Sequence, residues 1–216
     1  MTGVFRSFRK CLLLAVVLPY VMSAASPDSM STSGGHTPWE FSLSGSYYAY
    51  PADEDNLIAV ARANRGDLQF EARYNYEDRK TGSVFAGWTF SAGRSLRIAM
   101  TPMAGMAFGR TTGVVPALEA SLGAGMFDFY AETEYLIDVH DNSGNFSYSW
   151  LELGVAPIEI IRLGLTAQRS RIVQSPLVLD RGLFAQIAPG PGKLSLYAFN
   201  LFTESWFLVM GIEISW

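Results

Sequence analysis

From residue 38 onward the chain alternates apolar and polar residues in segments of roughly ten residues, with turn residues between the segments. The clearest segment is 68–76 (LQFEARYNY), in which the even-numbered residues from Leu68 to Tyr76 are apolar and the odd-numbered ones are polar. Successive side chains of a β-strand point to opposite faces, so this pattern predicts strands with one apolar and one polar face. We expect strands at 39–49, 56–64, 68–76, 83–91, 95–107, 113–123, 126–136, 146–156, 159–169, 178–188, 193–201 and 205–216.

The composition of the two faces indicates which one points outward. The apolar face is rich in Trp, Tyr, Phe, Leu and Met, and the polar face carries many small and charged residues. A membrane barrel turns its apolar face toward lipid and its polar face toward the lumen. Unpaired edge amides are costly in lipid, so the sheet must close. The predicted fold is therefore an all-β, closed antiparallel transmembrane β-barrel of twelve strands and short turns, covering residues 38–216, with a soluble exported barrel as the alternative.

The first 37 residues have a different character. Residues 1–25 combine three basic residues, an apolar stretch (CLLLAVVLPYVM) and a small-residue cleavage site, which predicts a secretory signal peptide. As a helix the apolar stretch would rise only about 18 Å, against a hydrocarbon core of about 30 Å. Residues 26–37 are small and polar, and we interpret them as a flexible leader.

Composition also excludes several classes of function. The sequence has 16 Lys and Arg against 20 Asp and Glu, a net charge of −4 that disfavours nucleic-acid binding. Two His and one Cys leave too few ligands for a zinc cluster, so we expect no metal site and no cofactor.

The last predicted strand, 205–216 (SWFLVMGIEISW), ends on an aromatic residue that follows apolar residues at every second position. It resembles the C-terminal assembly signal of Gram-negative outer-membrane β-barrel proteins. The resemblance implies insertion in the outer membrane by the barrel-assembly machinery, and the size is similar to that of small twelve-stranded, porin-like barrels. The residues that carry the signal are Trp206, Ile212, Ile214 and Trp216.

The polar faces of the predicted strands supply the candidate lumen residues. Acids outnumber bases among them, and the segment 126–136 is densest, with Asp128, Glu132 and Glu134 inward and Phe127, Phe129 and Tyr135 toward lipid. Such acids could attract cations into a pore, or Arg–carboxylate ladders could close a narrow barrel. The candidate solute-path residues are Glu71, Arg73, Arg97, Glu119, Asp128, Glu132, Glu134, Glu152 and Arg162.

A second group of basic residues falls near the predicted outer loops. Arginine matches phosphate bidentately, so these side chains are candidate contacts for lipopolysaccharide, although ordinary solvated loop charge explains them equally well. The group comprises Arg79, Lys80, Arg110, Arg169 and Arg171.

We expect a small porin-like channel for small hydrophilic solutes rather than an enzyme. A non-conducting structural or surface barrel is the main alternative, and an outer-membrane lipid hydrolase is a third. His140, Ser143 and Asn145 resemble the catalytic group of an outer-membrane phospholipase, but Asn142 stands where that pattern has its Ser. The segment is also typical of a hairpin tip.

Overall fold

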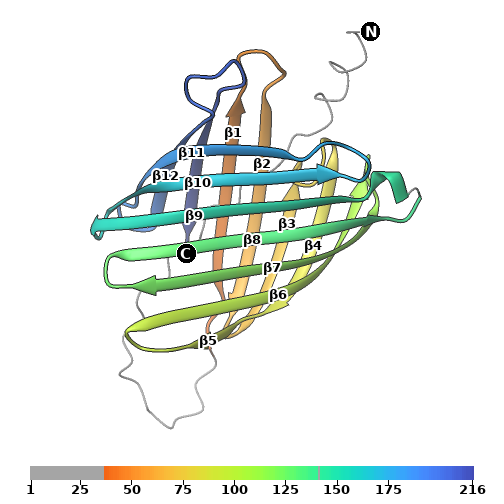
Figure 1. Ribbon diagram of the computed structural model, residues 1–216. Helices are drawn as coiled ribbons and strands as arrows, with labels where there is room; N and C mark the ends of the chain where they lie inside the picture. The colour runs from red at the N-terminus through yellow and green to blue at the C-terminus, as the bar shows by residue number, and fades with distance from the viewer. Residues whose placement is uncertain (1–36, 141) are drawn as a thin grey trace.

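The computed structural model describes residues 37–140 and 142–216, which form one antiparallel β-sheet curved into a barrel (Figure 1). The predicted signal peptide (1–25) and all of the predicted leader except residue 37 lie outside the described residues. The strands are β1 (Glu40–Ala49), β2 (Asn56–Arg65), β3 (Leu68–Tyr74), β4 (Thr81–Trp88), β5 (Phe90–Ala92), β6 (Leu96–Gly109), β7 (Gly113–Ala124), β8 (Phe127–Asp138), β9 (Phe146–Ile158), β10 (Ile161–Ile172), β11 (Val178–Ile187), β12 (Gly192–Phe199) and β13 (Phe207–Ser215). A short 3₁₀ turn, η2 (Asn142–Gly144), precedes β9.

The barrel closes where the first and last strands meet. β1 pairs antiparallel with β13, from Ser42 opposite Ser215 to Ala49 opposite Leu208. β4 and β5 both pair with β6 and are separated only by Thr89, so together they make one strand of the wall. The thirteen segments therefore build a closed barrel of twelve strands, which confirms the predicted fold.

The two ends of the barrel differ. Connections β1–β2, β3–β4, β6–β7, β8–β9, β10–β11 and β12–β13 lie at one end, which we call the loop end; the other connections lie at the turn end, where β1 also begins and β13 ends. Connections at the turn end are short, as in residues 66–67 between β2 and β3. Short turns at one end and longer loops at the other are typical of outer-membrane barrels.

The exterior is apolar and carries aromatic side chains near both ends. Exposed rings near the turn end come from Trp39, Phe41, Phe70, Trp88, Phe90, Phe127 and Trp216. Exposed rings near the loop end come from Tyr47, Tyr74, Phe108, Tyr135 and Trp206. Exposed aliphatic residues such as Leu153, Leu165 and Ile212 lie between the two groups. An apolar band between two aromatic girdles is the surface expected of a lipid-facing barrel.

The described residues contain no helix that is long and apolar enough to cross a membrane.

One predicted strand end is wrong. The alternating pattern placed Tyr76 on the same outward face as Tyr74, but β3 ends at Tyr74 and Asn75 adopts a positive φ of 57°. Asn tolerates this left-handed conformation better than most residues. The chain turns there, so the Tyr76 ring enters the barrel and is fully buried while Tyr74 is exposed.

Candidate functional site

The barrel interior holds a network of charged side chains around Arg73 of β3. Its guanidinium contacts Glu71 (Nε to Oε2, 2.8 Å), Glu134 (Nη1 to Oε2, 3.0 Å) and Glu132 (Nη2 to Oε1, 3.1 Å). The Arg73 and Glu132 side chains are completely buried. Burying a charge is costly unless it is paired and hydrogen-bonded, so these groups depend on one another.

The same network continues to a second arginine. Arg62 of β2 donates to Glu71 (Nε to Oε1, 2.7 Å) and to Glu119 of β7 (Nη2 to Oε1, 2.6 Å). Gln69 donates from Nε2 to Glu71 at 2.7 Å and to Glu119 at 3.1 Å. β2 and β7 are not neighbours in the sheet, so the Arg62–Glu119 pair bridges the interior between separate parts of the wall.

A second network is centred on Arg162 of β10. Its Nε contacts both carboxylate oxygens of Asp128 at 2.9 and 3.0 Å, and its Nη1 donates to Glu152 at 2.5 Å and Gln186 at 3.0 Å. Glu152 also accepts hydrogen bonds from Trp150 Nε1 at 3.0 Å and the Tyr197 hydroxyl at 2.9 Å. The carboxylate oxygens of Glu152 are therefore held by three different strands, β9, β10 and β12.

A glycine makes room for this network. A Cβ atom on Gly154 of β9 would lie 2.6 Å from Arg162 Nε and 2.6 Å from an Asp128 oxygen, which is closer than side chains allow. Any other residue there would push the ion pair apart.

A separate ion pair joins Lys193 Nζ to Glu213 Oε2 at 3.0 Å. Among the described residues, the buried charged side chains are seven glutamates, three arginines and one lysine. Formal negative charge therefore exceeds positive charge inside the barrel by 7 − 4 = 3. Charge of one sign in a low-dielectric enclosure attracts the opposite ion.

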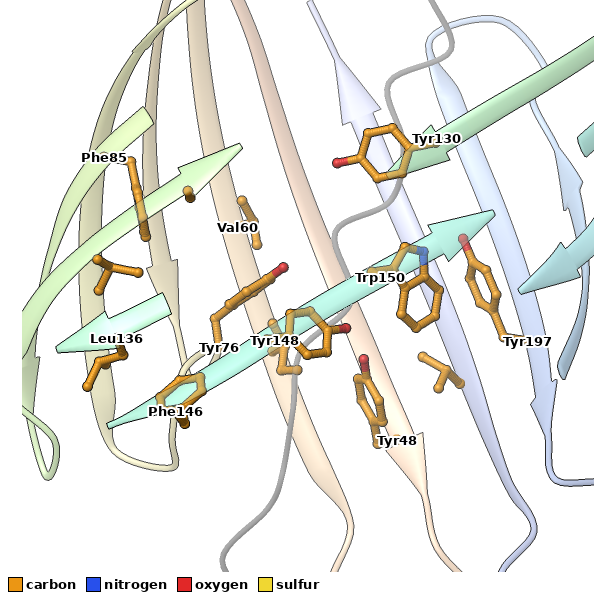
Figure 2. Close-up of a cluster of buried hydrophobic side chains, with 14 of the residues drawn as sticks. Tyr48, Val60, Tyr76, Phe85, Tyr130, Leu136, Phe146, Tyr148, Trp150 and Tyr197 are labelled. Atoms are coloured by element: carbon orange, nitrogen blue, oxygen red, sulfur yellow. The ribbon is translucent and has the colours of Figure 1, made fainter. Parts of the chain in front are cut away.

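Aromatic side chains fill much of the remaining interior (Figure 2). The Tyr76 hydroxyl donates to Glu132 at 2.7 Å, and Arg73 lies 4.2 Å from the centre of the Tyr76 ring. The Trp150 ring packs edge-on against Tyr197 at a centroid distance of 5.2 Å. Sequence reasoning assigned aromatics to the lipid face and missed these. The sequence of segment 146–156 contained the information needed to find them. Its even-numbered positions are Phe146, Tyr148, Trp150 and the lumen residue Glu152, so the three rings point to the same face as Glu152.

The structure brings together most of the predicted solute-path residues. Glu71, Arg73, Glu119, Glu132 and Glu134 belong to the first network, and Asp128, Glu152 and Arg162 to the second. Arg97 takes part in neither. Arg97 is on the inward face of β6, but it is the second residue of the strand, next to the turn end, and its side chain is exposed. It therefore lies away from both networks.

The five candidate lipopolysaccharide contacts do not lie together. Arg79 pairs with Glu54 and donates from Nη2 to the backbone oxygens of Glu54 and Asp55 at 2.8 and 3.0 Å, and Arg110 pairs with Asp78 at 3.2 Å. These two arginines tie loops together. Lys80 is exposed in the β3–β4 loop, whereas Arg169 and Arg171 are exposed on the outer wall of β10.

The proposed hydrolase residues do not form a buried site. His140 is largely exposed, and its Nδ1 lies 3.8 Å from Asp138. The Asn145 side chain accepts a hydrogen bond from the Asp138 backbone at 2.8 Å, which is a loop-closing contact. Among the described residues, no group of His, Cys, Asp and Glu has the arrangement of a metal site.

Comparison with solved structures identifies the fold. The KdgM porin superposes with a TM-score of 0.61 at 8% identity, covering 81% of this chain and 99% of that one. The fold is that of a small outer-membrane porin. The NanC porin gives a TM-score of 0.53 at 9% identity, covering 82% of this chain and 98% of that one. No protein-family model matches the sequence, and no curated protein sequence is significantly similar to it.

The porin fold and the apolar exterior agree on location. Transmembrane β-barrels of this type belong to outer membranes, and both the girdled surface and the closed sheet of this chain meet the requirements of lipid. The chain is thus an outer-membrane β-barrel, and the resemblance stated from its last strand is confirmed at the level of fold.

Proposed function

We propose that the barrel is a small porin-like channel for small hydrophilic solutes and that its interior favours cations. The observation that carries this is the excess of carboxylates among the hydrogen-bonded, charged side chains that cross the interior. A purely structural barrel could be filled with apolar residues at lower cost, because buried ion pairs seldom stabilise more than a well-packed apolar core.

The solute is expected to differ from that of at least one relative of the fold. A structure of the KdgM porin is described as a complex with disordered oligogalacturonate, at a TM-score of 0.62 to this chain. Oligogalacturonate is a polyanion, and an interior with excess carboxylates would repel it. Small cationic or neutral solutes fit the present charge distribution better.

The test is conductance of the refolded protein in a planar bilayer. The wild type should conduct and select cations, measured as a reversal potential in a salt gradient. Replacing Asp128→Asn, Glu132→Gln and Glu134→Gln together keeps side-chain shape and removes charge, so the reversal potential should move toward zero. The matched control is Asp67→Asn, Glu159→Gln and Glu204→Gln, which removes three exposed acids and should change selectivity much less. Unaltered selectivity in the interior variant would exclude these acids from the solute path.

The dense packing favours a second candidate, a non-conducting barrel. Glu132, Trp150, Tyr148 and Tyr197 are fully buried, so in this conformation side chains occupy the interior at their level. Conduction through the channel would then require Arg–carboxylate contacts to open. A silent bilayer containing correctly folded protein would support the structural barrel instead.

A further inference from the structure

Three arginines form an isolated basic patch on the outer wall. Arg169 and Arg171 of β10 and Arg181 of β11 are exposed and have outward parity, because the inward positions of β10 are the even-numbered ones, such as Arg162 and Thr166. We call these three residues the arginine patch. All three lie within four residues of the loop end of their strands.

The strand register places the patch residues together. Arg169 lies opposite Leu179 on β11, and Arg181 lies opposite Ala167, so Arg169 and Arg181 are diagonal neighbours. Such neighbours have Cβ atoms about 7–8 Å apart, and residues two apart on one strand are separated by a similar distance. One anionic group could therefore be reached by more than one guanidinium.

Hydroxyl groups extend the patch across the next strands. On β9, Ser149 lies opposite Arg169 and Ser147 opposite Arg171. Ser149 is in turn hydrogen-bonded to Thr133 of β8, with 3.0 Å between the two oxygens. Near the loop end, the outer wall of β9 and β10 therefore carries hydroxyl and guanidinium groups beside exposed apolar residues such as Leu179 of β11.

The patch lacks counter-charges. No outward position of β8, β9, β10 or β11 carries a carboxylate, and among the described residues the three guanidinium groups have no hydrogen-bond or ion-pair partner. Arg73 and Arg162, by contrast, are paired inside the barrel, and Arg79 is paired at the loop end. An arginine on a lipid-facing wall costs much less near the membrane interface than at the midplane, and near the interface the anions of the membrane can pair with it.

We propose that the arginine patch is a binding site for the phosphate groups of a phosphorylated glycolipid in the outer leaflet. The loop end faces outward in barrels of this type, which puts the patch at headgroup level. Arginine forks bind phosphate oxygens bidentately, and the Ser147 hydroxyl adds a donor. Below the patch, Leu165 and Leu183 face each other and are exposed, so they would contact the acyl chains of the same lipid.

The proposal is tested by native mass spectrometry of the refolded protein in detergent, titrated with bisphosphorylated lipid A. The test variant is Arg169→Gln, Arg171→Gln and Arg181→Gln. The matched control is Arg65→Gln, Arg94→Gln and Arg97→Gln, which removes three exposed charges at the turn end. We expect the test variant to bind lipid A about tenfold more weakly, whereas the control keeps wild-type affinity. Dephosphorylated lipid A should bind the wild type as weakly as phosphorylated lipid A binds the test variant.

Three results would overturn the proposal. One is equal lipid A affinity in the wild type and the test variant. Another is a loss of lipid A affinity in the control as large as that in the test variant, which would indicate non-specific charge attraction. The third is a change in oligomeric mass without lipid in the test variant, which would make the patch an interface between copies of this chain. If the triple variant fails to refold, lipid A bound to the wild type is competed with inorganic phosphate and with phosphorylated lipid. Displacement of lipid A by phosphorylated lipid only supports a lipid site. Displacement of lipid A by millimolar inorganic phosphate alone contradicts it. None of these readouts depends on conductance.

Discussion

Arg73 is the side chain on which the interior network depends most, so its replacement provides the sharpest test of that network. Arg73→Met keeps most of the length of the side chain and removes the guanidinium. Glu132 and Glu134 then lose the only arginine that contacts them in the described part of the chain, while Glu71 keeps Arg62. Breaking a buried ion pair by removing one partner costs about 3–5 kcal/mol, because the other charge stays buried without compensation.

The effect can be measured by urea unfolding of the refolded protein in detergent, followed by tryptophan fluorescence. If the free energy of unfolding falls by about 2 kcal/mol per molar urea, a loss of about 3–5 kcal/mol lowers the urea concentration at the unfolding midpoint by about 1.5–2.5 M. The control Arg94→Met removes an exposed guanidinium at the turn end. Substitutions of exposed surface residues change stability by about 0.5 kcal/mol or less, so the control midpoint should move by less than about 0.25 M.

The cause of the loss can be separated from simple loss of packing. If uncompensated carboxylates are responsible, adding Glu132→Gln and Glu134→Gln to Arg73→Met should recover much of the lost stability. Acidification should also narrow the difference from the wild type, because protonated carboxyl groups no longer need a counter-charge. Equal midpoints for Arg73→Met and Arg94→Met would refute the argument, as would a triple variant less stable than Arg73→Met alone.

Two further predictions concern assembly and packing. Deleting Trp216 or changing it to Asp should lower the amount of folded barrel in outer-membrane fractions, measured by immunoblot of heat-modified gel bands, with Trp39→Asp as a control for loss of an exposed ring; unchanged levels would make the C-terminal resemblance coincidental. Gly154→Ala should destabilise the barrel by about 1–3 kcal/mol in the urea assay, since its Cβ would lie 2.6 Å from Arg162 Nε. Gly45→Ala is the matched control, because its Cβ would lie no closer than 3.8 Å to any neighbour, and a similar loss in both would contradict the steric explanation.

The alternation of apolar and polar residues was sufficient to predict the fold and most strand positions. A strand has a side-chain period of two, so a single wrong register would turn charges into lipid, and this makes the pattern a strong constraint. Segment 126–136 illustrates it: Glu132 and Glu134 are buried while Phe127 and Tyr135 are exposed, as their parity predicts. The alternation fails at Asn75, where a positive φ ends the strand, so the Tyr76 side chain points into the barrel.

Only the tertiary structure decided which charged residues meet. Arg62 and Glu119 are 57 residues apart, and their contact depends on barrel closure and on the strand register, which no local pattern contains. The same holds for the aromatic interior, because Trp150 and Tyr197 have an apolar character that suits lipid as well as a packed core. The arginine patch is a further case: parity puts Arg169 outward, but only pairing with β11 brings Arg181 beside it. Local sequence determines which face a side chain occupies, and long-range pairing determines its neighbours.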